Sequence, residues 1–525
     1  MSTYHDLRDH IAALRERSLL YVVDRPINKD TEMHPLVRWQ YRGGIPERAR
    51  KAFLFTNVVD SRGRHYANDV LVGGLAGTPE IYAVGLGCPV AAIGDVWQRA
   101  LSEPIDPVVV DDGPVQEVVH RQGGAGGAGD FDTMPIPIST PGFDNAPYLN
   151  SAQTVTRSPV DGVRNVGHYR GQIKSPTTCG VFFTSPAKHA YLHWNAARAR
   201  NQPLDLAFVI GAPPVVSYAA VNQVPYGVDE YTLAGGLARE PIKLLRCETV
   251  DLEVPAHAEV VIEGHLRTDR VEPEGPFGES HGYVHPRSHS PVFEITCVTH
   301  RRDYCWTSFI SQVTPSESSV IKKVSLEPML LRFLRDTLGI SAVCDVSMHE
   351  PLTNLRKVVF VQFDNPRRTE VWRALKGVAA YRDEIGKIVV AIDSDIDPRN
   401  LDAVWWAIAY RARPHNDVQI LRGQAKGHAP PFGDSVDRED SNLLIDATLK
   451  DKVPPISLPA RPYMTRAREI WEELRLPELS PESPWYGYVL SPDEWPPELQ
   501  EEADLAVRGR YYETGLKLGQ LSQPS

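Results

Sequence analysis

The sequence Glu274-Gly-Pro-Phe-Gly-Glu279 places two carboxylates five residues apart, with two glycines and a proline between them. Glycine and proline favour a tight, non-helical backbone, so a turn here aims both carboxylates into one space with little side-chain bulk between them. Two acids that share a pocket push their pKa values apart, so that one holds a proton when the other has released it. The pattern therefore suits proton transfer, and the alternative interpretation is a surface turn with two solvated acids.

The composition indicates an ordinary globular protein. The chain of 525 residues is too long for one hydrophobic core and predicts about three domains. Its formal net charge is −11 and it has no run rich in lysine and arginine, which argues against nucleic acid or an anionic membrane as a partner. No apolar run approaches the roughly 20 residues of a membrane-spanning helix, and the first residues show no apolar signal region.

The cysteines are scattered and form no CxxC pair: Cys88, Cys179, Cys247, Cys297, Cys305 and Cys344. This usage favours buried, reduced thiols over a disulfide framework or a zinc cage. We therefore expect a cytoplasmic protein.

The pattern of the chain changes twice along its length. Residues 1–115 mix helical and strand-like segments and predict a small N-terminal α/β domain. Residues 116–315 contain short runs rich in Val, Ile, Phe and Thr that Gly and Pro punctuate, for example residues 152–156, 206–210, 215–220 and 260–262. Many short strands predict a β-barrel or sandwich, which one helix over residues 187–200 interrupts. The two-carboxylate turn lies late in this β domain.

The last third of the chain predicts a helix and then another α/β domain. Residues 316–340 form a long linker helix, which Ser318 or Ser319 caps. Residues 341–525 alternate strand and helix again, which indicates a parallel α/β layer. A helical stretch near the end, around residues 499–516, is expected to be exposed and to pack on a neighbouring subunit.

The glycine-rich run at residues 123–129 contains a formal GxGxxG match. A phosphate-binding loop of this kind follows a strand and opens a helix, whereas here acidic residues and a proline-rich run follow. The run is therefore interpreted as a flexible surface or interdomain loop.

Three polar segments upstream of the turn carry further candidate ligands. Arg170 has the planar fork that pairs with carboxylates or phosphates, and Asn165 offers an oxygen for a hard cation. His189 and His193 share a helix face, but alanine follows His189 where a zinc-protease motif needs glutamate. Together with Glu230, such N and O donors suit Mn²⁺ or Mg²⁺ bridging a phosphate. The alternatives are a polar loop, packed histidines and an acid at a helix N-terminus.

In this order the segments resemble the UbiD family of decarboxylases, which use prenylated FMN. The matching parts are residues 165–170, His189, Glu230, the turn at residues 274–279, Lys387 and the Asp395-Ile-Asp-Pro398 loop with Trp405 and Trp406 after it. The resemblance runs over most of the chain. It implies an N-terminal α/β portion, a central split β-barrel resembling flavin reductases and a C-terminal α/β domain that forms a homodimer or higher homo-oligomer.

The resemblance also implies an activity. UbiD-type enzymes carry out reversible, non-oxidative decarboxylation of aromatic, heteroaromatic or α,β-unsaturated carboxylic acids, with release of CO₂. By resemblance, Glu279 delivers the proton that replaces CO₂, and Glu274 and Arg170 form the ion pair beside the cofactor and the leaving carboxylate.

The same resemblance implies a set of cofactors. A divalent metal, usually Mn²⁺, joins the phosphate of prenylated FMN to Asn165, His189 and Glu230, a K⁺ ion lies nearby, and Lys387 contacts the phosphate. The spacing from Arg170 leaves His193 as an alternative to His189. A flavin prenyltransferase is implied as the supplier of the cofactor.

Two residues near the implied site bear on the substrate. Ser280 is small and predicts a roomier or more polar pocket, and Lys188 either contacts a polar substituent or is a solvated surface lysine. The competing functions are a split-barrel flavin reductase or flavin-binding oxidoreductase, and a non-catalytic assembly partner. The chain has no credible nicotinamide fingerprint, and the combination of Arg170, Glu274 and Glu279 argues against a non-catalytic role.

Overall fold

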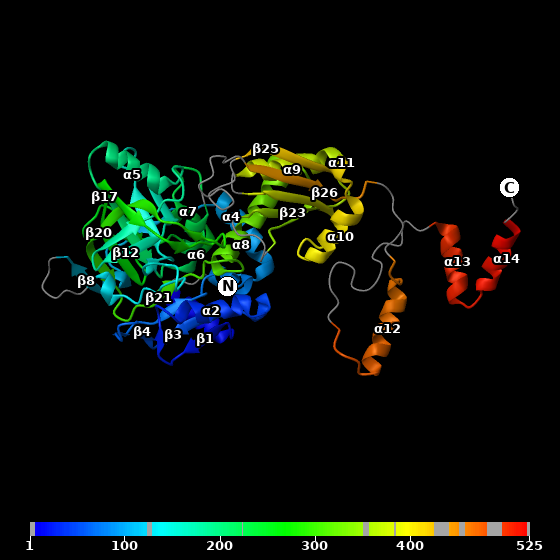
Figure 1. Ribbon diagram of the computed structural model, residues 1–525, viewed down its shortest axis with the longest axis horizontal. Coiled ribbons are helices and arrows are strands. Elements are labelled where there is room, and N and C mark those ends of the chain that lie inside the picture. The colour runs from blue at the N-terminus through cyan, green and yellow to red at the C-terminus, as the bar shows by residue number, and fades with distance from the viewer. Residues whose placement is uncertain are drawn as a thin grey trace.

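The computed structural model describes residues 6–122, 129–222, 224–349, 356–382, 385–424, 440–450, 457–479 and 496–521. A large antiparallel sheet lies on its left side in Figure 1. Within these ranges the sheet has nine strands in the order β11-β10-β14-β17-β20-β13-β12-β9, with β8 paired to β20. The strands are β8 (Val118–Arg121), β9 (Tyr148–Leu149), β10 (Gln153–Arg157), β11 (Arg164–His168), β12 (Gly171–Ser175), β13 (Thr178–Val181), β14 (Leu204–Ile210), β17 (Val260–Glu274) and β20 (Ser288–His300).

The two long strands β17 and β20 bend this sheet into the predicted split barrel. Their register shifts between Glu263 and Gly264 and again between Leu266 and Val271, and such bulges increase strand twist. A Cβ atom on Gly264 would collide with the carbonyl oxygen of Glu294, so the close approach of the strands requires glycine here.

Both faces of the barrel sheet are covered. Along β14, Leu206, Phe208 and Ile210 enter a core shared with α5 (His189–Ala199) and α2 (Met33–Arg42). The intervening Ala207 and Val209 enter a second core shared with α3 (Pro79–Leu86), α4 (Ile93–Ser102), α6 (Pro214–Val221) and α7 (Glu230–Ala238). This alternation follows from the two-residue period of a strand, and it explains why the strand is apolar throughout.

Residues 215–220 form helix α6, so the prediction of a strand there was wrong. Nearly every side chain of this helix is buried, including Val215, Val216 and Tyr218. A short apolar run that is buried on all sides lacks the periodicity that separates helix from strand. Pro214 at the first helical position and the hydrogen bond from the Tyr218 hydroxyl to the Leu75 carbonyl (2.8 Å) favour the helix.

The N-terminal portion combines helices with small sheets. Helix α1 (Leu7–Glu16) precedes a sheet with the order β1-β3-β6-β21, in which β21 (Trp306–Ser308) runs parallel to β6. The edge strand of the N-terminal sheet thus comes from beyond the barrel. The elements of this sheet and of the smaller ones are β1 (Leu20–Val23), β2 (Ile27–Asn28), β3 (Ala52–Phe55), β4 (Val58–Val59), β5 (His65–Tyr66), β6 (Val70–Val72), β7 (Val108–Val109), β15 (Lys243–Arg246) and β16 (Glu253–Pro255).

The linker helix α8 (Glu317–Arg332) continues as a π-helical turn over Phe333–Thr337. Its N-cap is Ser316 rather than the predicted Ser318 or Ser319, because Ser316 and Ser319 hydrogen-bond reciprocally in a capping box. The buried carboxylate of Glu317 accepts hydrogen bonds from the backbone N–H groups of Gly73, Leu75, Ala76 and Ile310. These bonds fasten the start of α8 to the N-terminal portion.

The C-terminal domain contains, in its described part, a five-stranded sheet with the order β22-β23-β24-β26-β25. The strands are β22 (Val343–Ser347), β23 (Val358–Phe363), β24 (Ile388–Asp393), β25 (Val418–Gln424) and β26 (Asp440–Asp446), and β23, β24 and β26 are parallel. Helix α9 (Arg368–Tyr381) covers one face and α10 (Leu401–Arg411) the other, followed by the short α11 (Pro414–Asp417). This is the predicted α/β layer.

The chain ends in helices α12 (Arg461–Glu473), α13 (Pro497–Val507) and α14 (Tyr511–Leu521), which lie away from the other domains (Figure 1). The single helical stretch predicted over residues 499–516 is therefore two helices, and Gly509 turns the chain between them with φ +74°. In the described part of the chain no helix is long and apolar enough to cross a membrane.

The described cysteines are free thiols, but only Cys179, Cys297 and Cys305 are buried as predicted, whereas Cys344 is exposed. The glycine-rich run at residues 123–128 lies outside the described residues. The predicted domain boundaries at residues 115, 315 and 340 stay predictions.

Candidate active site

The turn at residues 274–279 connects the end of β17 to the small hairpin of β18 (Phe277–Gly278) and β19 (Val284–His285). Gly275 has φ +91°, a conformation that side chains disfavour, and a Cβ atom on Gly278 would clash with Thr140. The Gly278 N–H donates to Asp144 Oδ1 (2.7 Å). Gly275 is therefore favoured by the backbone conformation, and Gly278 by the close approach of the Thr140 side chain.

The guanidinium group of Arg170 contacts both glutamates of the turn. Its Nε and Nη2 donate to the two carboxylate oxygens of Glu274 at 2.9 and 2.8 Å, and its Nη1 donates to Glu279. The Glu274 side chain is fully buried, whereas 12% of the Glu279 side chain is exposed. Burial lowers the pKa of Arg170, but the hydrogen bonds and charges of the two glutamates raise it above its usual value. Arg170 is thus a fixed cation.

Aromatic rings complete the surroundings of Arg170. Its Cζ lies 4.0 Å from the ring centroid of Phe182 and 4.8 Å from that of Phe277, distances at which a cation–π interaction is favourable. The Tyr148 ring packs against Phe277 at 4.3 Å, and burial raises the pKa of Tyr148. The apolar surroundings exclude water from the Arg170–Glu274 pair, and the pair survives burial because its hydrogen bonding is bidentate.

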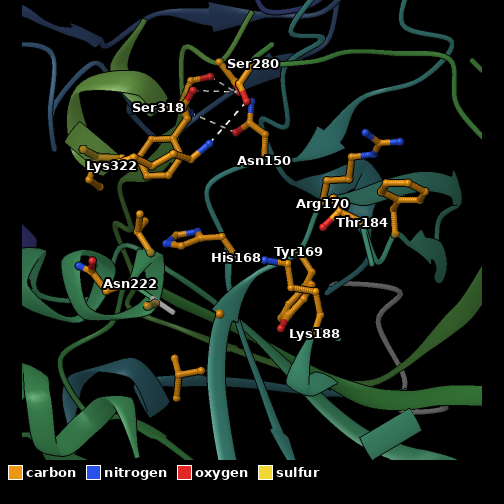
Figure 2. A pocket seen from close by; sticks show the side chains of 18 of the residues that line it. Asn150, His168, Tyr169, Arg170, Thr184, Lys188, Asn222, Ser280, Ser318 and Lys322 are labelled. Atoms are coloured by element: carbon orange, nitrogen blue, oxygen red, sulfur yellow. Dashed lines mark hydrogen bonds between the residues drawn. The ribbon is translucent and has the colours of Figure 1, made fainter. Parts of the chain in front are cut away.

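A cavity of about 260 Å³ opens beside this ion pair (Figure 2). Five of the sequence-predicted site residues line it: Asn165, Arg170, His189, Glu230 and Glu279. Glu274 lies behind Arg170. Lys387 is not among the lining residues, and its Nζ lies 2.9 Å from Asp440 Oδ2. His193 is also outside the lining and is hydrogen-bonded to Thr156 Oγ1 at 3.0 Å.

The predicted metal ligands combine a buried carboxyl group, a buried amide and a partly buried imidazole. Glu230 opens α7, where its Oε2 accepts from the Val166 N–H (2.8 Å), and burial raises its pKa to about 8. The side-chain amide nitrogen of Asn165 is buried without a hydrogen-bond partner within the described residues. Burial, and then the charge of Lys188, lowers the pKa of His189, which favours the neutral ring that binds metals.

These three residues fit a divalent cation. A buried carboxylate becomes ionised when a cation neutralises it, and an amide and a neutral imidazole supply further donors of the kind that Mn²⁺ or Mg²⁺ binds. No group of three or more His, Cys, Asp or Glu residues suited to a metal occurs in the described ranges. The candidate set differs from such a group because it includes an amide.

The sequence did not point to several cations that also line the cavity: Lys322, Arg356 and Arg382. Lys322 lies on α8, and the two arginines flank strands and helices of the C-terminal domain. None of them belongs to a short motif with the other site residues. The cavity therefore lies between the barrel and the C-terminal domain.

Two family models match the chain over most of this architecture. The 3-octaprenyl-4-hydroxybenzoate carboxy-lyase Rift-related domain matches residues 108–313, and the C-terminal domain of the same carboxy-lyases matches residues 319–447. The chain belongs to the UbiD family. It is therefore a carboxy-lyase, as the resemblance implied.

Known structures agree with this assignment. The UbiD-class enzyme HmfF from Pelotomaculum thermopropionicum, solved in complex with FMN, is 30% identical and superposes with a TM-score of 0.77 over 88% of this chain and 100% of its own. An evolved dimeric form of HmfF in complex with prFMN superposes with a TM-score of 0.75 over 87% of this chain and 97% of its own. The UbiD-family fold expectation, with its split barrel and flanking α/β domains, is confirmed.

Other relatives share the fold or part of the sequence. Vanillic acid decarboxylase from Sedimentibacter hydroxybenzoicus, in its closed form, is 23% identical with a TM-score of 0.76 over 90% of this chain and 100% of its own. An uncharacterized protein of Archaeoglobus fulgidus is 31% identical over 348 residues, which are 64% of this chain and 67% of that protein.

Proposed function

We propose that this UbiD-family enzyme catalyses the reversible, non-oxidative decarboxylation of an aromatic, heteroaromatic or α,β-unsaturated carboxylic acid with prenylated FMN as cofactor. The observation that carries the proposal is the buried guanidinium of Arg170, which binds buried Glu274 and cavity-lining Glu279 at once. The similarity to HmfF, whose structures contain prFMN or FMN, supports a flavin in this cavity.

Arg170 and Glu274 orient the leaving carboxylate. The bidentate pair holds the guanidinium in one place. Because Glu274 compensates most of the guanidinium charge, Arg170 orients an incoming carboxylate without trapping it in a tight salt bridge. The rings of Phe182 and Phe277 keep water away from this end of the cavity. When bound, prenylated FMN supplies the electron sink that loss of CO₂ requires.

Glu279 supplies the proton. When the bond between the ring carbon and the carboxylate breaks, its electron pair stays on the carbon, and the protonated carboxyl of Glu279 donates to that carbon to form the new C–H bond. The resulting Glu279 carboxylate remains hydrogen-bonded to Arg170 Nη1. In the reverse direction Glu279 takes the proton back, so the same groups serve carboxylation at high CO₂.

The cofactor phosphate would be held at the other end of the cavity. Asn165, His189 and Glu230 would bind Mn²⁺ or Mg²⁺, which neutralises part of the phosphate charge, with K⁺ as a second cation nearby. The raised pKa of Glu230, which a bound cation would lower, supports this part of the proposal. Lys387 is proposed to reach the phosphate, which requires that it leave Asp440. His193 stays the alternative to His189.

We also propose a cytoplasmic homodimer or higher homo-oligomer that receives its cofactor from a flavin prenyltransferase. The exposed side chains of Trp405 and Tyr410 on α10 support self-association through the C-terminal domain, because large exposed aromatic side chains are enriched in protein interfaces.

The decisive experiment is purification from a host that co-expresses a flavin prenyltransferase. We expect a released ligand with the mass of prenylated FMN, bound Mn²⁺, and CO₂ release from members of a panel of aromatic acids. The proposal would be replaced by a flavin reductase if the protein contains ordinary FMN or no flavin and oxidises NADH at the same rate in Glu274→Gln and Glu279→Gln as in the wild type.

A further inference from the structure

The buried side chain of Asp144 holds the backbone of the acid turn. Its Oδ1 accepts a hydrogen bond from the Gly278 N–H and its Oδ2 accepts one from the Thr140 N–H, both at 2.7 Å. The Asp144 N–H in turn donates to the Thr140 carbonyl at 3.0 Å, which closes residues 140–144 into a turn of their own. Asp144 is therefore itself fixed, and it fastens the acid turn to an earlier part of the chain.

The Gly278 N–H depends on this acceptor because its hairpin does not supply one. In the hairpin of β18 and β19 the Glu279 N–H donates to the Tyr283 carbonyl at 3.0 Å. Successive N–H groups of a strand point to opposite sides, so the Gly278 N–H, one residue earlier, points away from β19. Removal of the Asp144 carboxylate leaves this N–H of a buried residue without its acceptor, and the backbone beside Glu279 then moves to find another.

The other end of the acid turn is held independently of Asp144. The Gly275 N–H donates to Gln172 Oε1 at 3.3 Å, and Glu274 ends the long strand β17, which pairs with β20 up to this residue. Loss of the Asp144 carboxylate should therefore displace Glu279 and leave Glu274 in place.

Glu279 depends on its backbone most in the form that reacts. As a carboxylate it accepts a charge-assisted hydrogen bond from Arg170. The protonated carboxyl that gives up its proton is neutral, so its bond to the guanidinium is weaker, and the backbone at residues 278 and 279 then sets the direction of the side chain. A displacement of about 1 Å at such a position lowers a rate by about 100-fold.

We propose that Asp144 is a positioning residue for Glu279, because its hold on the Gly278 N–H aims the protonated carboxyl at the carbon that loses CO₂. The inference rests on the proposed function and adds a residue to it. Asp144 is not among the residues that line the cavity, so it acts through the turn rather than on the substrate.

The structural test compares crystal structures of the wild type, Asp144→Ala and Asp144→Asn. In Asp144→Ala we expect the Glu279 carboxyl to shift by about 1 Å or more while the Arg170–Glu274 pair stays in place. Asparagine keeps an oxygen for the Gly278 N–H, so Asp144→Asn should hold Glu279 near its wild-type position. Asp144→Ser, whose hydroxyl is too short to reach that N–H, replaces Asp144→Ala if the alanine variant does not fold.

The kinetic test uses the holoenzyme with benzoate, thiophene-2-carboxylate and 3-phenylprop-2-enoate, one acid from each class of the proposed function. On each acid that the wild type decarboxylates, we expect kcat of Asp144→Ala to fall about 100-fold with KM changed less than about twofold, because the Arg170–Glu274 pair still orients the carboxylate. Exchange of the new C–H hydrogen of the product for deuterium in D₂O needs Glu279 but no CO₂, and it should slow by the same factor. Asp144→Asn should recover most of both rates.

Asp60→Ala is the matched control, because the buried Asp60 likewise accepts from two backbone N–H groups, those of Arg62 and Arg64 at 2.9 Å. We expect this variant to keep the wild-type kcat and exchange rate even though it loses stability. If Glu279 stays in place in Asp144→Ala, or if kcat falls no more than in Asp60→Ala, Asp144 is not a positioning residue even where decarboxylation occurs. If the wild type decarboxylates none of the three acids, the proposed function fails for them, and the crystal structures alone decide whether Asp144 positions Glu279.

Discussion

The two ends of the cavity satisfy their buried charges in opposite ways. At one end, Arg170 donates two hydrogen bonds to Glu274 and a third to Glu279, so the protein itself compensates its charges. At the other end, Glu230 has a pKa raised by burial and the amide nitrogen of Asn165 has no partner within the described residues. The first end is complete in the protein alone, whereas the second is built to be completed by something that the protein binds.

The largest effect expected from this comparison is the loss of turnover in Glu279→Gln. Glutamine keeps the shape of the side chain and can still contact Arg170, but it has no proton of suitable acidity to give to carbon. We expect kcat to fall by about three orders of magnitude or more, with prenylated FMN content unchanged. Single-turnover CO₂ release measures this loss, and wild-type turnover in the variant would remove Glu279 from the proton-donor role.

Glu274→Gln should have the largest effect on stability. Removing one partner of a buried ion pair leaves the other charge uncompensated, and we expect the free energy of unfolding to fall by about 3 kcal/mol. Glu272→Gln is the matched control, because Glu272 lies two residues earlier on β17 with its side chain 35% exposed, and we expect a change below about 1 kcal/mol. If urea denaturation shows the same loss of unfolding free energy in Glu274→Gln and Glu272→Gln, the Arg170–Glu274 pair does not preorganise its end of the cavity.

His168, which also lines the cavity, predicts acid sensitivity. Burial lowers the pKa of His168 from 6.5 to about 4. Between these two pH values His168 is protonated in the unfolded chain but neutral in the folded protein. The stability contributed by neutral His168 is therefore complete above pH 6.5, and about 3 kcal/mol of it is lost as pH falls to 4. We expect a shallower loss in His168→Gln than in wild type when unfolding is followed from pH 7 to 4. Identical pH profiles would contradict a buried, neutral His168.

The smallest effect is expected for Glu230→Gln in the protein freed of metal and cofactor. Because the pKa of Glu230 is raised from 4.5 to about 8, the stability of the wild type falls as pH rises through this range, and glutamine has no such loss. We expect the variant to be more stable than the wild type at pH 7, yet to bind Mn²⁺ at least tenfold more weakly. If the metal-free variant is instead less stable than the metal-free wild type, the protein itself stabilises the Glu230 carboxylate without a bound cation.

The sequence predicted what short segments determine. Strands such as residues 206–210, the linker helix, the C-terminal α/β layer and the acid turn follow from local patterns, and the structure contains each of them. Residues 215–220 were mistaken for a strand because a fully buried helix has no polar face. The sequence did not predict three cationic residues of the cavity, Lys322, Arg356 and Arg382, because only tertiary packing brings them there.

The edge strand β21 ties the order of folding to the order of synthesis. Its partner β6 ends at Val72, but β21 is made only when residues 306–308 are added. At about 5–20 residues per second, the ribosome takes tens of seconds to add the intervening chain. During that time β6 presents an open edge that invites pairing with other chains. The open edge of β6 therefore exposes the nascent N-terminal sheet to intermolecular pairing, and we expect a fragment that stops before β21 to aggregate.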